Sequence, residues 1–299
     1  MEHTAPESLT SDILYGQPLY PAAPLSWMAP LWSFICGAAA SGAWSWTAAA
    51  LLRMAWGLLL AGPLLGLVWA VSISNGWRES LMDDPPPAAD DAGRALPYTL
   101  SGSASHRLAA WLSAVSAWWH QVRPAIGKPT LQLAVCSAFS LIVAGQWGVP
   151  SLVLAVLGLA TAYACGLGLA KRPFGVLVSI ACPMFIAWAL GHAAFTRLRP
   201  VSLLAAVLFA IIFYSCSALN EHKKPLVAWQ AAAQTAAVGS LIAVKQPLMA
   251  AAVALLGTLP SLLLPALETR QGRERYFRST QWPLAASMLL TALAIGYRP

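Results

Sequence analysis

Charged residues are scarce in this chain. Only 10% of its 299 residues carry a charge and 58% are apolar, whereas about a quarter of a typical soluble domain is charged. A chain with so few charges cannot cover itself with an ordinary water-exposed surface. Apolar runs long enough to cross about 30 Å of hydrocarbon recur from Leu25 to the C-terminus. We therefore predict an all-α, polytopic membrane helix bundle.

The sequence also lacks the patterns of a disulfide framework, a zinc site and a signal peptide. Its five cysteines all fall in apolar segments, without metal-binding spacing. Residues 1–25 hold three acids and no Lys or Arg, so they have no basic n-region. We predict that they form a soluble cytoplasmic arm and that residues 26–299 form one membrane domain.

The apolar runs predict about nine transmembrane helices. Their approximate ranges are 26–44, 51–73, 130–147, 150–169, 174–195, 201–219, 226–244, 247–267 and 282–297. Because this number is odd, we expect the two termini on opposite sides of the membrane.

The positions of Lys and Arg predict the orientation of these helices, because cytoplasmic loops carry an excess of basic residues. If the N-terminus is cytoplasmic, the loops on that side hold thirteen of the 18 basic residues: Arg78, Arg94, Arg107, Arg123, Lys128, Lys171, Arg172, Lys223, Lys224, Arg270, Arg273, Arg275 and Arg278. We therefore predict a cytoplasmic N-terminus. The net charge of +7 is explained by topology and by contact with membrane lipid, and we expect no nucleic-acid partner.

The stretch 74–129 is too polar to lie in hydrocarbon and predicts a long cytoplasmic loop. Within it, residues 106–121 place apolar side chains at three- and four-residue spacing, which indicates an amphipathic helix. These side chains are Leu108, Trp111, Leu112, Val115, Trp118 and Trp119. We expect this helix to lie flat on the membrane or on the cytoplasmic mouth of the bundle.

Three oxygen-bearing side chains follow the second apolar run at spacings of four. They are Asn75, Glu79 and Asp83, and they share one face if the helix continues. Such oxygen ligands can hold Mg²⁺, which in turn binds phosphate. A solvated turn at the membrane surface explains the same spacing, and the pattern alone leaves both interpretations open.

The segments Pro24–Gly37 (PLSWMAPLWSFICG), Leu59–Leu64 (LLAGPL) and Asn75–Asp83 (NGWRESLMD) resemble the opening of UbiA-type prenyltransferases, most closely their chlorophyll and bacteriochlorophyll synthase branch. The resemblance implies a nine-helix bundle in a bacterial inner membrane, cytoplasmic or intracytoplasmic. It also implies transfer of an isoprenoid from its diphosphate to an acceptor, with Mg²⁺ as cofactor.

The resemblance implies a ligand- and diphosphate-binding site at matching positions. In the family's first acidic motif, N-D-x-x-D-x-x-x-D, the asparagine corresponds to Asn75 and the first aspartate to Gly76. Glu79 and Asp83 then match the second and third aspartates and are the candidate Mg²⁺ ligands. Later elements of the family add the remaining candidates, which are Arg94, Tyr163, Lys171, Asn220 and Glu221.

The departures from the family pattern predict impaired catalysis. One aspartate is replaced by Gly76, another is lengthened to Glu79, and the second acidic motif keeps only Asn220 and Glu221. We predict that the chain binds a pigment or isoprenoid, or serves as an accessory subunit of a photosynthetic or pigment-handling complex. The alternative is an active Mg²⁺-dependent prenyltransferase that esterifies a chlorophyllide or another acceptor. A transporter is a weaker third hypothesis, because no internal inverted repeat is evident.

A bundle of this kind predicts a wide apolar cavity that can hold bacteriochlorophyll, an isoprenoid or a quinone. His192, assigned to the middle third of the fifth segment, is a candidate ligand for the central magnesium of a chlorophyll. A neutral histidine that is hydrogen-bonded to a neighbouring helix is the alternative.

Overall fold

A computed structural model describes residues 29–73, 104–169, 172–218, 224–262 and 270–297. The described residues form helices and contain no strand, which confirms the all-α prediction. The helices are α2 (Ala29–Ala40), α3 (Ala48–Leu59), the π-helical turn η2 (Leu60–Leu64), α4 (Leu65–Ile73), α6 (Ala104–Gln146), α7 (Val149–Gly166), α8 (Pro173–Phe195), α9 (Pro200–Ala218), α10 (Lys224–Ala243), α11 (Pro247–Leu262) and α12 (Arg270–Gly296).

Five helical stretches are long and apolar enough to cross a membrane. They are Ala48–Ile73, Gly127–Gln146, Val149–Gly166, Phe174–Phe195 and Leu226–Ala243. Shorter apolar helices cover Ala29–Ala40, Pro200–Cys216 and Pro247–Leu262. Each of the nine predicted segments overlaps a described helix, so the polytopic membrane bundle is confirmed, while the number of spans stays a prediction. The predicted arm, residues 1–25, lies outside the described residues.

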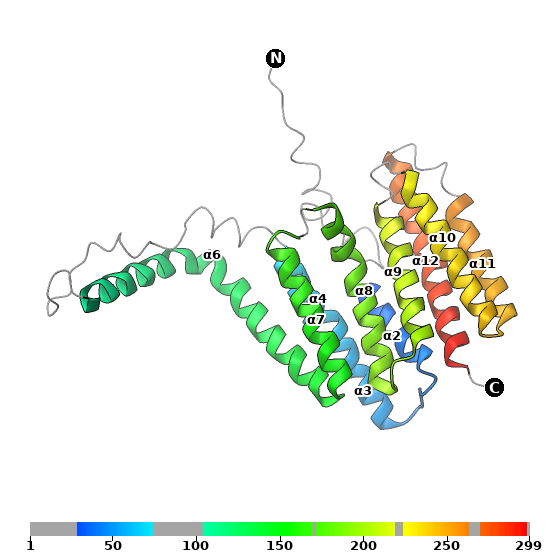
Figure 1. Cartoon of the computed structure of the whole chain (residues 1–299), viewed down its shortest axis with the longest axis horizontal. Helices are drawn as coiled ribbons and strands as arrows, with labels where there is room; N and C mark the ends of the chain where they lie inside the picture. The colour runs from blue at the N-terminus through cyan, green and yellow to red at the C-terminus, as the bar shows by residue number, and fades with distance from the viewer. Residues whose placement is uncertain (1–28, 74–103, 170–171, 219–223, 263–269, 298–299) are drawn as a thin grey trace, which may run out of the picture.

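The helices stand side by side and alternate in direction (Figure 1). One end of the bundle, which we call the polar end, is where α4, α7, α9 and α11 finish and where α8, α10 and α12 begin. The predicted basic loops join these helix ends. The opposite end holds the short connections at 41–47, 147–148, 196–199 and 244–246. The alternation therefore gathers at one end the connections that the sequence predicts to be cytoplasmic.

Helix α2 lies inside the bundle and is packed at backbone contact by two other helices. A Cβ added to Gly37 would collide with the backbone of Trp188 on α8, and one added to Gly191 would collide with the backbone of Phe34. Gly296 on α12 meets the backbone of Ala39 in the same way. Close approach of this kind is typical of small residues at helix interfaces in membranes. Glycine at these positions therefore lets α8 and α12 pack against α2.

Two side chains of α2 bind carbonyl groups on these same neighbours. Ser33 Oγ donates to the carbonyl oxygen of Met184 at 2.7 Å, and Trp32 Nε1 donates to that of Ala285 at 3.0 Å. Each bond satisfies a polar atom in an apolar setting, where an unpaired donor is costly. The bonds and the glycine contacts together fix the position of α2 along the bundle axis.

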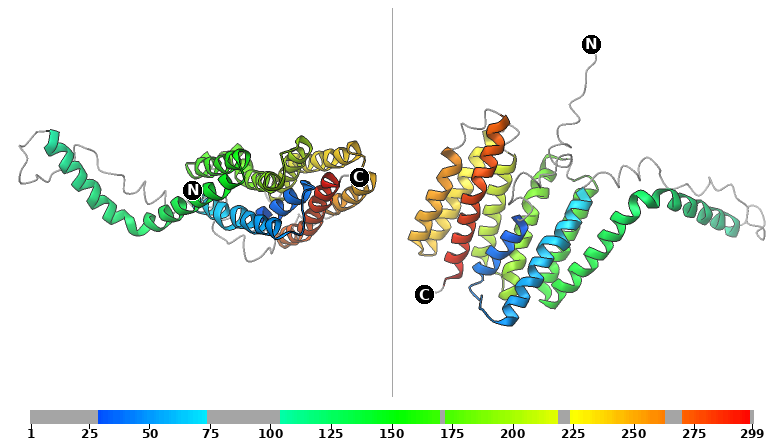
Figure 2. Two further views of the ribbon diagram at one scale, coloured as in Figure 1. Left: turned by 90° about the horizontal axis from the view of Figure 1, so that it is seen from below. Right: turned by 180° about the vertical axis from the view of Figure 1, so that it is seen from behind.

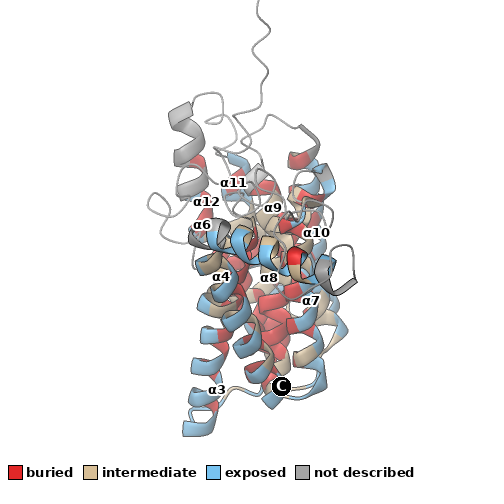
Figure 3. Cartoon of the chain, turned by 90° about the vertical axis from the view of Figure 1, so that its left-hand side faces the viewer, coloured by how far each residue is buried: buried red, intermediate tan, exposed pale blue. Residues whose placement is uncertain are grey.

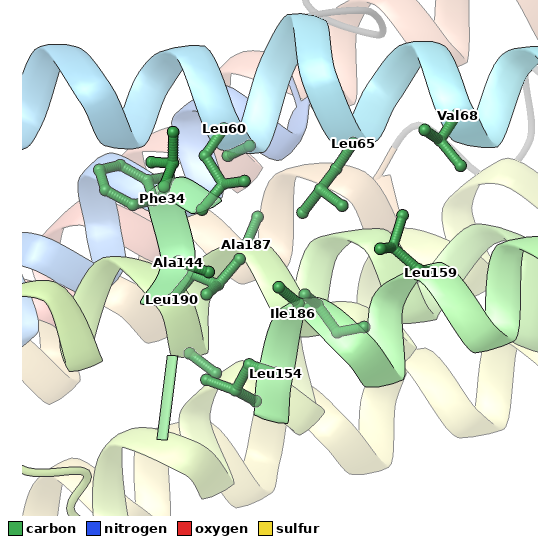
Figure 4. Packing of buried hydrophobic residues seen from close by; sticks show 14 of the residues in the cluster. Phe34, Leu60, Leu65, Val68, Ala144, Leu154, Leu159, Ile186, Ala187 and Leu190 are labelled. Atoms are coloured by element: carbon green, nitrogen blue, oxygen red, sulfur yellow. The ribbon is translucent and has the colours of Figure 1, made fainter. Parts of the chain in front are cut away.

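Two hydrophobic clusters flank α2 and α8. The first packs α3, η2 and α4 with α6 and α7, and the second packs α9, α10 and α12. Figure 4 shows the first, with Leu65 and Val68 of α4 facing Leu159 of α7 and Ile186 of α8. Figure 3 shows buried residues on the faces between helices and exposed residues on the outside. Exposed apolar side chains on that outer surface include Leu131, Val153 and Leu255, as lipid contact requires.

Helix α6 differs from the sequence prediction. The predicted surface helix at 106–121 and the predicted span at 130–147 are two parts of one continuous helix, Ala104–Gln146. This helix bends, and its first part, which we call the α6 arm (residues 104–120), points away from the bundle (Figures 1 and 2). Pro124 and Pro129 lie in the middle of the helix. Proline lacks a backbone N–H and bends helices, so these residues explain why one continuous helix changes direction.

Candidate functional site

Most of the predicted site residues lie outside the described part of the chain. They are Asn75, Glu79, Asp83, Arg94, Lys171, Asn220 and Glu221, and their assignment, including the Mg²⁺ ligands, stays a prediction. Tyr163 and His192 are described. Within the described ranges, no group of three or more His, Cys, Asp and Glu side chains gathers to hold a metal ion. The helix ends nevertheless determine where the remaining segments begin.

The acidic residues of the chain are confined to a few segments. Three of the 11 precede residue 13, and the other eight are Glu79, Asp83, Asp84, Asp90, Asp91, Glu221, Glu268 and Glu274. All eight lie between α4 and α6, between α9 and α10, between α11 and α12, or at the start of α12. The connections at the opposite end contain no acid. Carboxylate chemistry in residues 29–299 is therefore restricted to segments attached at the polar end.

Two helix ends at the polar end, those of α7 and α4, are in direct contact. A Cβ on Gly166, at the end of α7, would meet the backbone oxygen of Ser72, in the last turn of α4. Asn75 follows Ser72 by three positions, and Lys171 follows Gly166 by five. The segment with the predicted Mg²⁺ ligands and the predicted diphosphate-binding lysine thus start from adjacent helix ends.

Tyr163 lies one turn before the end of α7, at the polar end of the bundle. Its hydroxyl forms a hydrogen bond of 2.8 Å with Ser137 Oγ on α6. This bond holds the phenol against α6 and still leaves acceptor capacity on its oxygen. The structure therefore connects Tyr163 to the helix that continues into the α6 arm, and a direct ligand contact stays a prediction.

Ser72 is a polar residue that sequence reasoning overlooked. It is 1% exposed, and its Oγ has no hydrogen-bond partner among the described residues. Buried polar atoms are rarely left unpaired without a functional or structural reason. The signal in the sequence was a lone serine in an apolar run, three residues before Asn75.

A second group of unpaired polar atoms lies near the polar end of α10 and α12. Gln230 Oε1, the Tyr276 hydroxyl and Gln281 Nε2 are buried without a hydrogen-bond partner among the described residues. Farther along these helices, Gln234 and Ser287 line a small cavity between α9, α10, α11 and α12. This cavity has room for little more than a water molecule. It is too small for the pigment or isoprenoid that the predicted wide cavity would hold.

His192 lies in the last turn of α8, toward the opposite end of the bundle. Because α8 ends at Phe195, as the predicted range 174–195 does, His192 lies in the last third of the segment, and its assignment to the middle third is wrong. His192 Nε2 lies 3.1 Å from the carbonyl oxygen of Arg197, which can only accept, so Nε2 carries the proton. Nδ1 then accepts from Ser202 Oγ at 3.0 Å. Ser202 Oγ in turn accepts from Trp188 Nε1 at 3.0 Å.

This network occupies both ring nitrogens of His192. A magnesium ion in a chlorophyll needs a free nitrogen lone pair. Here the lone pair of Nδ1 accepts the hydrogen bond from Ser202. The geometry therefore favours the hydrogen-bonded alternative for His192. The pigment-ligand hypothesis stays a prediction, and it requires the bond to Ser202 to break.

We expect Ser202→Ala to destabilise the protein by at least about 2 kcal/mol, because it unpairs two buried groups that cost about 1–3 kcal/mol each. The substitution leaves His192 Nδ1 and Trp188 Nε1 buried without a partner, and each costs its desolvation energy. Thermal unfolding in detergent measures the effect. Thr235→Ala is the matched control, since its exposed hydroxyl bonds only to Ala231 of the same helix. Equal effects of the two substitutions would contradict the role of the network.

A comparison with known proteins identifies a relative. The chain is 30% identical over 204 residues to the bacteriochlorophyll synthase 34 kDa chain of Chloroflexus aurantiacus. The chain is a relative of this synthase. The matched region covers 67% of the chain but only 56% of the relative. No family model matches the chain, and no solved structure matches it.

The match to the synthase confirms the relationship to the UbiA-type prenyltransferase superfamily that Pro24–Gly37 and the later segments indicated. One of those segments, Leu59–Leu64, forms the π-helical turn η2 together with its flanking residue. Pro63 lies inside that turn and cannot donate a backbone hydrogen bond. The turn lies between α3 and α4, and α4 ends two residues before Asn75. Impaired catalysis, which the departures in the acidic motifs indicate, stays a prediction.

Proposed function

We propose that this UbiA-like protein of a bacterial inner membrane binds a pigment, an isoprenoid or a quinone at its polar end but transfers no isoprenoid efficiently. It then acts as a ligand-binding or accessory subunit of a photosynthetic or pigment-handling complex. The proposal rests on Gly76, which stands where the family's first acidic motif has an aspartate, in a chain related to bacteriochlorophyll synthase. The polar end faces the cytoplasm in this proposal.

The number of carboxylates limits the chemistry. A prenyl diphosphate ionises when metal ions and basic side chains stabilise the departing diphosphate, and carboxylates hold those metal ions. Glu79, Asp83 and Glu221 supply oxygen ligands for one Mg²⁺ rather than two. The loss of one contact to developing charge costs about 3–4 kcal/mol. Two such losses, one at Gly76 and one in the second acidic motif, make efficient transfer unattainable. They leave a site that binds a diphosphate or a headgroup.

The arrangement of helix ends supports binding at the polar end. Eight acids and the basic candidates Arg94 and Lys171 all belong to segments attached there. The contact between Gly166 and Ser72 brings two of these segments to adjacent starting points. Opposite charges on neighbouring segments can hold Mg²⁺ and an anionic group together.

An esterification assay tests the proposal. The purified protein, in lipid vesicles with Mg²⁺, geranylgeranyl diphosphate and bacteriochlorophyllide, is expected to release no esterified pigment above background in a chromatographic assay. Absorption titration of the same sample is expected to show pigment binding. Turnover that Asp83→Asn abolishes and the neighbouring Asp84→Asn preserves would overturn the proposal of impaired catalysis. Absence of binding would overturn the ligand-binding role.

The second candidate is an active prenyltransferase, and the match to the synthase favours it. In that case Glu79 and Asp83 hold a single Mg²⁺ that suffices for ionisation, while Lys171 and Arg94 bind the diphosphate. The same assay separates the two candidates, because only an active enzyme produces an ester whose formation stops when Mg²⁺ is removed.

A further inference from the structure

The α6 arm has an exposed apolar face. Leu108 is 58% exposed and Leu112 is 52% exposed, and Trp111 and Trp119 are exposed as well. Their spacing places them on one side of the helix. Burying one such side chain yields about 1.5–3 kcal/mol, so this face favours an apolar environment that the described part of the chain does not supply.

The charge of α6 is entirely of one sign. The 43 residues of this helix include Arg107, Arg123 and Lys128 and no Asp or Glu. Arg107 and Lys128 are exposed. Each basic residue near an anionic bilayer surface contributes about 1 kcal/mol of attraction. A surface with anionic headgroups over hydrocarbon therefore matches the apolar face of the arm, Arg107 on the arm, and Arg123 and Lys128 just beyond its end.

The position of the arm fits this surface. The second part of α6, Gly127–Gln146, is long and apolar enough to cross a membrane, so the bend lies where the span meets the headgroups. From the bend, the arm runs crosswise to the bundle helices at the polar end (Figure 1), and Figure 2 shows it reaching sideways, clear of the other helices.

The tryptophan residues of the arm also indicate a position at the membrane–water interface. Trp118 and Trp119 lie next to each other with ring centroids 6.3 Å apart, and Trp111 precedes them by two turns. Tryptophan is enriched at membrane–water interfaces because its ring is apolar and its N–H needs a polar partner. The arm thus combines an apolar face, tryptophan and Arg107, with two further basic residues just beyond its end, and these are features of an interfacial helix.

We propose that the α6 arm is an anchor that lies in the headgroup region of the leaflet at the polar end and prefers anionic lipid. It extends the contact of the protein with that leaflet well beyond the bundle. This inference is independent of any enzymatic activity and of the ligand that the polar end binds.

Spin labels on the arm of the full-length chain test the proposal. Leu112→Cys carries a nitroxide on the apolar face and Ser113→Cys carries one on the opposite face, in vesicles that contain phosphatidylglycerol. The unsubstituted chain, labelled in parallel, corrects for its native cysteines. We expect the Leu112 label to collide more often with oxygen than with a water-soluble nickel chelate, and the Ser113 label to show the reverse. We also expect this contrast to weaken in pure phosphatidylcholine and in Arg107→Gln/Lys128→Gln.

Two outcomes would overturn the anchor. If both labels were equally accessible to the nickel chelate, the arm would lie in water. If the Leu112 label showed spin–spin broadening between copies, the apolar face would be an interface with a second chain. A contrast that is identical in phosphatidylcholine and phosphatidylglycerol would contradict the preference for anionic lipid.

Discussion

Gly191→Ala is expected to destabilise the bundle by at least about 3 kcal/mol. The added methyl group would overlap the backbone of Phe34, including its carbonyl oxygen, and backbone atoms cannot move aside as the end of a flexible side chain can. Overpacking a core typically costs about 1–3 kcal/mol. A methyl group of α8 that collides with the backbone of α2 is expected to cost an energy at or above the upper end of that range. Loss of helical signal on heating in detergent measures the change.

Gly66→Ala is the matched control for this prediction. Gly66 lies in α4, and a Cβ there would meet no atom within 4 Å. Alanine is also the better helix former by about 1 kcal/mol. We therefore expect the two glycine substitutions to differ in sign, with Gly66→Ala neutral or stabilising. If both behaved alike, α2 and α8 would not be in backbone contact.

The double substitution Gly76→Asp/Glu79→Asp is expected to raise the rate of prenyl transfer at least about 100-fold. It restores the carboxylates of the family's first acidic motif, and one well-placed contact to developing charge is worth a factor of 10²–10³. The assay follows esterified bacteriochlorophyllide over time at saturating Mg²⁺ and geranylgeranyl diphosphate. This prediction rests on the proposed impairment.

Ala88→Asp controls for charge alone. It adds a carboxylate to the same connection between α4 and α6, outside the acidic motif, and is expected to leave the rate unchanged. If Gly76→Asp/Glu79→Asp had no effect while the protein still bound its ligand, carboxylate supply would not be the factor that limits transfer. Acceleration by Ala88→Asp would point to net charge instead.

The sequence predicted the helices well because membrane helices follow from composition. Crossing hydrocarbon requires long apolar runs with their backbone hydrogen bonds satisfied internally, and such runs are visible without any tertiary information. The position of His192 was misassigned although the range was right, because His192 lies near the end of the predicted range 174–195 and not in its middle third. The end of α8 at Phe195 agrees with the end of that range.

The packing of the bundle could not be predicted from the sequence. Gly37, Gly191 and Gly296 look like any other glycines in apolar runs, because nothing local shows which helix will approach them. The continuity of α6 was not predicted, because its first part, 106–121, and its second part, 130–147, were assigned separately to the membrane surface and to the membrane interior. Ser72 was overlooked since its burial depends on α7, a helix nearly a hundred residues later.

The candidate site, too, was only partly predictable from the sequence. The resemblance identified its residues by position, and the order of the helices allowed their segments to be assigned to one side. The contact between Gly166 and Ser72 was visible only in the structure. It is this contact that relates the segment of Asn75 to that of Lys171.

The placement of α2 bears on how the chain is made. Trp32 bonds to a carbonyl 253 residues further along, and Gly37 faces a helix that also comes much later. A ribosome delivers α2 long before either neighbour exists, and contacts this distant in sequence form slowly. Among the described helices, α2 is therefore made first but obtains its last packing partner only when α12 has been made. A chain interrupted before α12 would leave α2 without one of its two helix partners. The packing of α2 therefore depends on a helix more than 200 residues later in the sequence.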